Sequence, residues 1–173
     1  MKKNTVCTKE RAMFECIPAV PEKLKQIWEY NIADNPDDPR WIRWGEEAME
    51  NNRTGRTKTF LILQDGEPVG EGTLIFDPAC SAIDGRLALA DGKNVTNVNA
   101  LRIRKEYENQ GHVSAMMKQM EQYARDLGYT RITIGVEAKE ARNLAIYLHW
   151  GYTDYICHEF DGGELVLYYG KNL

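Results

Sequence analysis

The residues best suited to binding an anion lie in one short stretch, "QGHVSAMM", where a turn meets the start of a helical pattern. A helix begins with unpaired backbone N–H groups and the positive end of its dipole, so its first turn attracts phosphate without a basic side chain. Gly111 also lacks the Cβ that would hold a ligand away from the backbone. We therefore expect an anion at the amides of Gln110, Gly111, His112, Val113 and Ser114. The alternative is that Gly111 only eases a tight turn between a strand and a helix.

A second candidate group lies later in the chain, in "ARNLAIYLHWGY". Asn143 and Tyr147 are four residues apart, so in a helix they share a face and both can point into one cleft. Taken alone, the pair fits a solvated asparagine and a half-buried tyrosine equally well.

Residues 31–50 hold six carboxylates against two arginines, together with two tryptophans. An acidic, tryptophan-rich wall of this kind can attract a cationic amine. The alternative is structural, because acidic residues near a helix start stabilise its dipole and tryptophans usually lie in the core.

The composition sets broad limits on the fold and the partners. The chain has 173 residues, a length that suits one domain over residues 1–173. Its 43% hydrophobic and 28% charged content is ordinary for a globular protein and excludes disorder and fibres. The net charge of -4 disfavours nucleic acid and anionic membranes, which need a dense basic face. No stretch approaches the ~18 apolar residues of a membrane span, so we expect a cytoplasmic protein.

The cysteines and histidines form no recognisable metal or redox motif. Cys7, Cys16, Cys80 and Cys157 lack CxxC spacing, and the histidines add no ligand pattern to them. We expect reduced thiols and no bound metal, while a disulfide between distant cysteines and a thiol nucleophile stay open as alternatives.

Hydrophobic periodicity places the candidate residues on a mixed set of helices and strands. It predicts helices over residues 20–33, 34–52, 111–128 and 139–151, the second with Asp38 as its N-cap and Pro39 at the first helical position. It predicts strands over 95–103 and 131–136, a hairpin within 59–76 around Asp65-Gly66, and a closing hairpin over 161–163. Residues 77–94 indicate only a loop, with or without an extra hairpin. The strand, helix and strand between 95 and 136 form a βαβ unit with parallel strands.

This arrangement resembles the GNAT superfamily of N-acetyltransferases over most of residues 10–171. That family binds the pyrophosphate of acetyl-CoA on a loop of pattern Arg/Gln-x-x-Gly-x-Gly/Ala. The pattern falls here on residues 108–113, where Gly111 matches and Glu108 and Val113 depart from it. The family relies mainly on backbone amides at this loop, and a side-chain change leaves those in place. A later family signature matches at Asn143, Tyr147, Gly151 and Tyr152.

The resemblance implies both the fold and the coenzyme. The fold class is α/β with mixed α+β character: a central mixed, mostly antiparallel twisted sheet with flanking helices and one parallel βαβ unit at the cofactor cleft. The coenzyme is acetyl-CoA, whose pantetheine arm the family holds through backbone groups that correspond to Leu101, Arg102 and Ile103. Residues 110–114, Asn143 and Tyr147 complete the expected cofactor contacts. Because members are often dimers, a homodimer is a further expectation.

The implied reaction is acetyl transfer from acetyl-CoA to the primary amine of a small, cationic acceptor, by direct attack in a ternary complex. Tyr147 lies where many members hold the general acid that protonates the thiolate, and its alternative role is packing against the pantetheine arm. The family's usual glutamate base corresponds to Asn97, which cannot accept a proton at neutral pH. Glu71 and then Glu137 are the candidates for the base, directly or through water; each is alternatively an ordinary surface carboxylate.

The resemblance also indicates where the acceptor binds, because in this family two early helices shape the acceptor pocket. The corresponding candidates here are Trp28, Tyr30, Asp34, Trp41 and Trp44. A polyamine, an aminoglycoside-like antibiotic or a basic peptide end would suit such a wall. The alternative function is a non-catalytic acyl-CoA-binding domain of the same fold, which Glu108, Val113 and the absent strand glutamate favour.

Overall fold

The computed structural model describes residues 12–173, so that Cys7 lies outside the described residues. Over this range the elements are, in order, β1 (Phe14–Pro18), α1 (Pro21–Asp34), α2 (Arg40–Thr54), β2 (Thr57–Gln64), β3 (Glu67–Ile75), β4 (Val95–Ile103), the 3-10 helix η1 (Lys105–Tyr107), α3 (His112–Asp126), β5 (Arg131–Glu137), α4 (Ala141–His149), β6 (Asp154–Asp161) and β7 (Glu164–Asn172). Cys16, Cys80 and Cys157 are free thiols.

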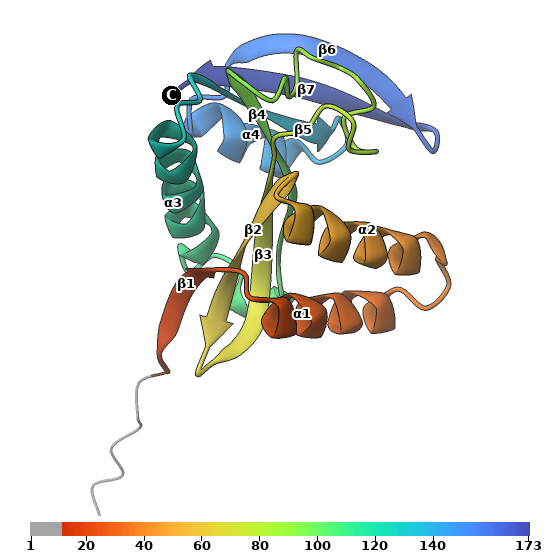
Figure 1. Ribbon diagram of the computed structural model, residues 1–173, viewed down its shortest axis with the longest axis vertical. Helices are drawn as coiled ribbons and strands as arrows, with labels where there is room; N and C mark the ends of the chain where they lie inside the picture. The colour runs from red at the N-terminus through yellow and green to blue at the C-terminus, as the bar shows by residue number, and fades with distance from the viewer. Residues whose placement is uncertain (1–11) are drawn as a thin grey trace, which may run out of the picture.

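The strands form one seven-stranded sheet in the order β1-β2-β3-β4-β5-β7-β6. Neighbouring strands are antiparallel except β4 and β5, which are parallel and are connected through α3. In Figure 1, α1 and α2 lie on one face of the strands β2 and β3, and α3 lies on the other face. The predicted fold class, a mostly antiparallel sheet with one parallel βαβ unit, is therefore confirmed.

The hairpin predicted around Asp65-Gly66 is present. Asp65 and Gly66 both have positive φ, 49° and 84°, which is the backbone of the type I′ turn that fits the twist of paired strands. The edge strand β1 was not predicted. It has only five residues, ends in a proline and pairs with β2 alone, so its sequence carries little of the alternation that marks longer strands.

The start of α2 differs from the prediction by one residue, and the predicted loop 77–94 is present without the extra hairpin. The N-cap of α2 is Pro39, one residue after the predicted Asp38, although the Asp38 carboxylate accepts hydrogen bonds from the amide and the guanidinium of Arg40 as a capping side chain does. Residues 77–94 contain no helix or strand, yet Cys80, Ile83, Leu89 and Ala90 are buried in a cluster with Tyr168 of β7. This loop belongs to the core although it has no regular structure.

A bulge in β4 changes the course of that strand. Thr73 of β3 pairs with Asn99, and Glu71 pairs with Arg102, so two β4 residues stand opposite Gly72 alone. One of the two, Ala100, has a positive φ of 53°. Pairing between β4 and β5 reaches only as far as Val98 and Ile134, so the two strands separate just before the bulge.

A buried ion pair ties α3 to the end of the chain. The Lys171 ammonium of β7 lies 2.7 Å from the carboxylate of Glu121, and both side chains are largely buried. The Lys171 ammonium also donates to the carbonyl of Trp150, directly after α4. Tyr152 donates its hydroxyl hydrogen to the same carboxylate at 3.1 Å. These contacts fix α3 and the end of α4 relative to the sheet.

We predict that replacing either member of this pair strongly destabilises the fold. Glu121→Leu leaves a buried ammonium unpaired and should lower the free energy of unfolding by about 3 kcal/mol, as should Lys171→Met. The double variant should lose clearly less stability than the two single variants added together, because it contains no buried charge without a partner. Urea denaturation of the four proteins measures this coupling.

The control is an exposed pair, Lys25 and Glu29 on α1, whose atoms lie 3.6 Å apart with side chains 70% and 63% exposed. Glu29→Gln should change the stability by no more than about 0.5 kcal/mol. Strictly additive losses at Glu121 and Lys171 would show that the pair is not coupled.

Candidate active site

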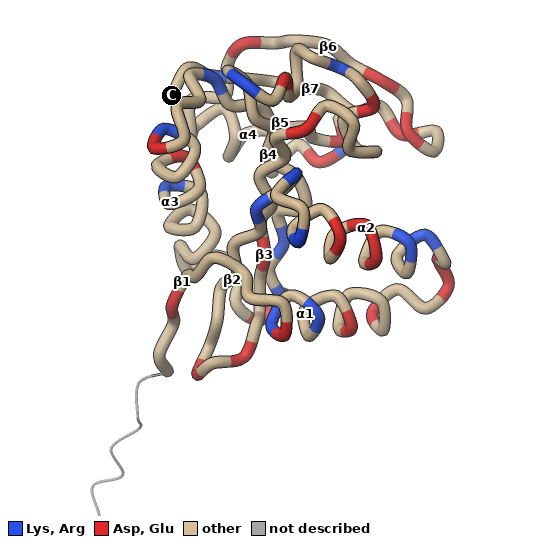
Figure 2. The backbone as a smooth tube through the Cα atoms, viewed as in Figure 1, with Lys and Arg blue, Asp and Glu red and all other residues tan. Residues whose placement is uncertain are grey.

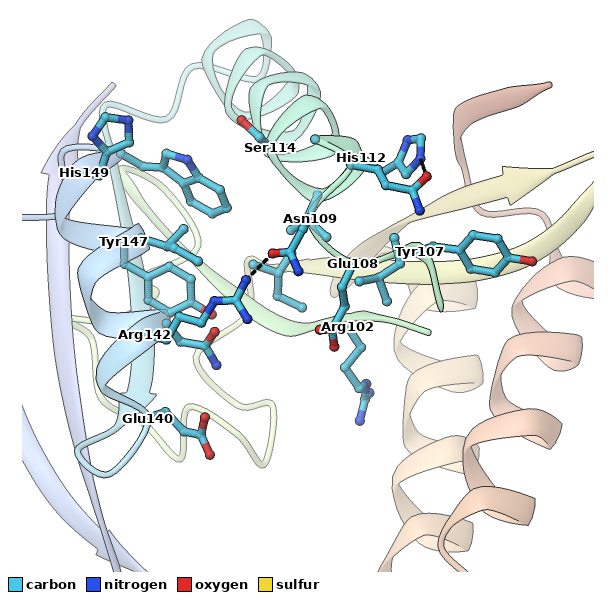
Figure 3. Close-up of a pocket in the computed structure, with 18 residues that line it drawn as sticks. Arg102, Tyr107, Glu108, Asn109, His112, Ser114, Glu140, Arg142, Tyr147 and His149 are labelled. Atoms are coloured by element: carbon cyan, nitrogen blue, oxygen red, sulfur yellow. Dashed lines mark hydrogen bonds between the residues drawn. The ribbon is translucent and has the colours of Figure 1, made fainter. Parts of the chain in front are cut away.

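The largest cavity described here, with a volume of about 710 Å³, lies between the start of α3, the end of β4 and α4. We call it the main cavity. All of the residues expected to contact a cofactor line it: Leu101, Arg102, Ile103, Gln110, Gly111, His112, Val113, Ser114, Asn143 and Tyr147. Figure 3 shows the turn from Tyr107 to Ser114 on one side of this cavity and the α4 residues Arg142 and Tyr147 on the other.

The start of α3 presents free backbone donors to the main cavity. Gly111 is the N-cap, its φ of 85° is left-handed, and no side chain caps the helix. The first backbone bond of the helix runs from the amide of Ala115 to the carbonyl of Gly111. Within residues 12–173, the amides of Gln110 to Ser114 donate no hydrogen bond to another group. Together with the helix dipole, these donors make the turn a binding site for an anion.

The edge of β4 supplies a second set of backbone groups. The amide of Arg104 donates to the carbonyl of Val69 on β3. Because amides alternate in direction along a strand, those of Ile103 and Leu101 point to the opposite edge. On that edge β5 has already separated from β4, so these groups have no strand partner and can bind an extended ligand.

Tyr147 of α4 is the main candidate for acid chemistry in this cavity. Burial raises the pKa of its phenol to about 12, so the hydroxyl stays protonated at neutral pH. Within the described residues the hydroxyl makes no hydrogen bond, and the ring packs beside Trp150 with centroids 5.9 Å apart. Tyr147 is thus a partly buried donor whose hydrogen is free to bond a ligand.

The structure adds cavity residues that the sequence did not predict. Arg142 of α4 donates a hydrogen bond to the side-chain oxygen of Asn109, which links α4 to the turn before α3 (Figure 3). The sequence gave one indication of Arg142, its position beside the predicted cofactor residue Asn143. Its hydrogen-bond partner Asn109 could not be predicted, because it is distant in the sequence. The ring of His112 stacks on Phe14 of β1 with centroids 3.9 Å apart, so His112 contributes its backbone rather than its imidazole.

The expected acceptor residues are divided between two smaller cavities. Trp28 and Trp44 line a cavity of about 430 Å³ beside α2, the α2 cavity. Tyr30, Asp34 and Trp41 line a cavity of about 470 Å³ between α1 and the ends of β3 and β4, the α1 cavity. Arg102 lines both of them and the main cavity as well.

In the expected aromatic wall, an arginine of the chain already lies over one face of each ring. The Arg102 guanidinium lies 5.1 Å from the ring centre of Trp28 and 4.8 Å from that of Trp41. Arg40 lies over Trp44 at 5.1 Å, and Arg104 lies over Tyr30 at 3.8 Å. Figure 2 shows that α1 and α2 carry both basic and acidic residues. A cation that approached the covered face of one of these rings would have to displace an arginine.

The two candidate bases are in very different surroundings. Glu71 of β3 is 1% exposed and lines the α1 cavity. Its Oε1 accepts hydrogen bonds from Asn31 at 2.7 Å and from Arg102 at 3.0 Å. Burial raises the pKa of Glu71, against the opposing effects of Arg102 and Asn31. Glu71 is therefore not the surface carboxylate that the sequence left open.

Glu137 lies at the end of β5 with its side chain 44% exposed and its carboxylate 3.2 Å from the Lys139 ammonium. It lines none of the three cavities described above. Asn97, which stands where a glutamate was expected, is buried and donates to the Thr133 hydroxyl. Of these three residues, the structure places only Glu71 at a cavity.

Comparison with known proteins agrees with this geometry. The model of the acetyltransferase (GNAT) family matches residues 20–152, which is more than half of the chain. No curated protein matches the chain. None of the described helices is both long and apolar enough to span a bilayer.

Solved structures with similar folds include proteins from three organisms. The ribosomal-protein-alanine N-acetyltransferase of Brucella melitensis is 12% identical, with a TM-score of 0.67 over 92% of this chain and 99% of that chain. The yncA protein of Salmonella typhimurium, solved with acetyl-CoA, is 10% identical, with a TM-score of 0.66 over 92% and 94%. The paia N-acetyltransferase of Thermoplasma acidophilum, solved with coenzyme A, is 12% identical, with a TM-score of 0.60 over 93% and 99%. At these identities the likeness shows the fold.

We predict that the stability effect of removing Arg102 depends on pH. Arg102→Met leaves the buried Glu71 carboxylate without its cation, at a cost of about 3 kcal/mol at neutral pH. The pKa of Glu71 in the folded protein, already raised by burial, should rise further. Below that pKa, Glu71 is neutral in the folded variant and no longer needs a cation. The stability lost by Arg102→Met should therefore become smaller as the pH falls through the pKa of Glu71. Urea denaturation at about pH 8 and about pH 5 measures the difference.

The matched control makes the same change in a Glu71→Gln background, where no carboxylate can titrate. There the effect of Arg102→Met should be the same at both pH values. If Arg102→Met also costs the same at both pH values with Glu71 present, Glu71 does not titrate in this range.

Proposed function

Since the chain belongs to the GNAT family of acetyltransferases, which uses acetyl-CoA, we propose that it transfers an acetyl group to the primary amine of a small acceptor. The observation that carries this proposal is the construction of the main cavity. Free amides at the start of α3, an unpaired edge of β4 and the free hydroxyl of Tyr147 line one space.

The main cavity fits acetyl-CoA in its chemistry. The amides from Gln110 to Ser114 would hold the diphosphate, as the helix dipole favours negative charge there. The edge groups of Leu101 and Ile103 would hold the amide-rich pantetheine arm as a further strand would. In the turn before α3, Glu108 replaces the cation or amide that the family has at this position. Arg142 of α4, which lines the same cavity, would supply a cation close to the diphosphate instead. Acetyl-CoA itself supplies an activated thioester.

The residues of the chain then divide the proton transfers between them. The acceptor amine is a cation at neutral pH and must lose a proton before its nitrogen can attack. Glu71 accepts that proton directly or through water, since its Oε2 has no partner within the described residues. The nitrogen bonds to the carbonyl carbon, and the bond from that carbon to sulfur breaks. Tyr147 gives its proton to the sulfur and regains one from the nitrogen.

We predict that the backbone shape at Gly111 controls coenzyme affinity. Gly111→Ala introduces a Cβ at a φ of 85°, where an L-residue is strained by about 1 kcal/mol. The backbone should relieve this strain by rotating the free amides at the start of α3 away from the ligand. The Kd for coenzyme A should therefore rise about tenfold, which corresponds to the loss of one charge-assisted hydrogen bond. Calorimetric titration with coenzyme A measures the change.

Gly128, just beyond the other end of α3, is the matched control. Its φ is 90°, and an added Cβ meets no atom within 4 Å, as at Gly111. Gly128→Ala should lose similar stability and bind coenzyme A as the wild type does. Equal weakening by both variants would mean that strain alone, and not the turn amides, accounts for the effect.

We predict that Tyr147→Phe lowers kcat about 100-fold while the Kd for acetyl-CoA stays unchanged. Thiol release from acetyl-CoA, measured across a panel of amines, gives kcat. Because burial raises the pKa of Tyr147 to about 12, the phenol remains protonated in the assay range. The rate should therefore not fall with rising pH on account of this group.

The control is Tyr155→Phe, which removes the hydroxyl of a tyrosine that is 53% exposed on β6 and should leave kcat unchanged. Tight binding of acetyl-CoA without turnover of any amine would overturn the proposal in favour of a non-catalytic acyl-CoA-binding domain. Full activity of Tyr147→Phe would remove Tyr147 from the chemistry.

A further inference from the structure

Two residues that line the α1 cavity each carry a buried polar atom that has no hydrogen-bond partner within residues 12–173, and the two atoms are of opposite character. One is the acceptor Oε2 of Glu71, and the other is the donor Nε of Arg104. Leaving a buried polar atom unpaired is costly, and each such atom calls for an explanation. A ligand with both a donor and an acceptor would satisfy the two atoms together.

Arg104 differs from the neighbouring arginines in having no acidic partner. Arg102 is paired with Glu71 at 3.0 Å, and Arg40 is paired with Asp38 at 2.8 Å. Within residues 12–173, no carboxylate lies within ion-pair distance of the Arg104 guanidinium, and no group accepts a hydrogen bond from it. The guanidinium lies over the Tyr30 ring, 3.8 Å from its centre. The ring fixes the plane of the guanidinium and leaves its N–H groups for a carboxylate.

Glu71 is the complementary half of the site. Asn31 and Arg102 both bond to Oε1, so the carboxylate is fixed in position while Oε2 remains free. A primary ammonium group, with three N–H donors, is a suitable partner for such an oxygen.

We propose that the α1 cavity binds a small zwitterionic amino acid as the acetyl acceptor, with its ammonium at Oε2 of Glu71 and its carboxylate at Arg104. This inference rests on the proposed function and names the class of acceptor. A volume of about 470 Å³ suits a molecule of this size.

The charges around the α1 cavity agree with a zwitterion. Its lining carries both signs in nearly equal number: the acidic residues are Asp34, Glu71, Glu106 and Glu108, and the basic ones are Arg102, Arg104 and Lys105. A polycation would find one face of Tyr30 and one face of Trp41 already covered by an arginine. The acidic segment 31–50 led us to expect a cationic acceptor. We now infer an acceptor that carries a carboxylate as well as its cationic amine.

The α1 cavity also adjoins the space assigned to acetyl-CoA. Arg102, Ile103 and Glu108 line both the α1 cavity and the main cavity. Glu71 of β3 pairs with Arg102 of β4, so an amine held at Glu71 lies beside the segment of β4 whose other edge is free to bind the thioester arm. The proton that the ammonium loses passes to Glu71, and the remaining bond changes are those of the acetyl transfer given above.

The test compares matched amines in the thiol-release assay. The common protein amino acids are assayed beside their α-amides, their decarboxylated amines and spermidine. At least one amino acid should show a kcat/KM about tenfold or more above that of its own amide, the expected value of one hydrogen bond to a charged group. Equal or faster turnover of the amides, the decarboxylated amines or spermidine would overturn the inference and leave the acetyltransferase proposal standing. Absence of turnover with every amine would overturn both.

Variants of Arg104 test whether the preference for an amino acid over its amide arises in the α1 cavity. Arg104→Gln should bring the kcat/KM ratio of the amino acid to its amide down to about one, and Arg104→Lys should restore part of it. The control is Arg53→Gln on α2, an exposed arginine paired with Glu50 far from the cavity lining, for which the ratio should stay as in the wild type. An unchanged ratio in Arg104→Gln would show that the carboxylate is not recognised at Arg104.

Discussion

The separation of β4 from β5 is the constraint on which the rest of the site depends. The two parallel strands pair only up to Val98 and Ile134, and the bulge at Ala100 then leads β4 away. Had the pairing continued, the amides of Leu101 and Ile103 would be used within the sheet and no extended ligand could bind there. The position of α3 follows from the same geometry, because the chain leaves the free end of β4 through η1 and reaches the start of α3 beside the gap.

The face of β4 opposite α3 shows how one side chain connects separate parts of the molecule. Arg102 is held by a buried carboxylate and by two tryptophan rings, and it lines all three cavities. An arginine suits this position because its planar group can stack on rings and form hydrogen bonds at its edge at the same time. A lysine could neutralise Glu71 but could not fix both rings and the carboxylate.

Local patterns in the sequence were sufficient for much of this structure. The hairpin at Asp65-Gly66, the βαβ unit and the turn at Gly111 each depend on residues close together in the chain, and the structure has all three. The same patterns gave no sign of β1 or of the burial of the predicted loop 77–94, because both depend on contacts with distant strands. The aromatic residues predicted for the acceptor wall line two cavities, but the arginines that lie over them could not be foreseen. Arg102 and Arg104 are remote in sequence from Trp28 and Tyr30, and only the folded sheet brings them together.

The free amides at the start of α3 have a consequence for how such a protein can diverge. A main-chain N–H is the same in every residue except proline, so most replacements along residues 110–114 would leave the donors in place. Selection on this part of the molecule therefore acts on the path of the chain more than on residue identity. A cradle of this kind can persist while nearly every side chain around it is exchanged, in keeping with folds that superpose closely at 10% to 12% identity.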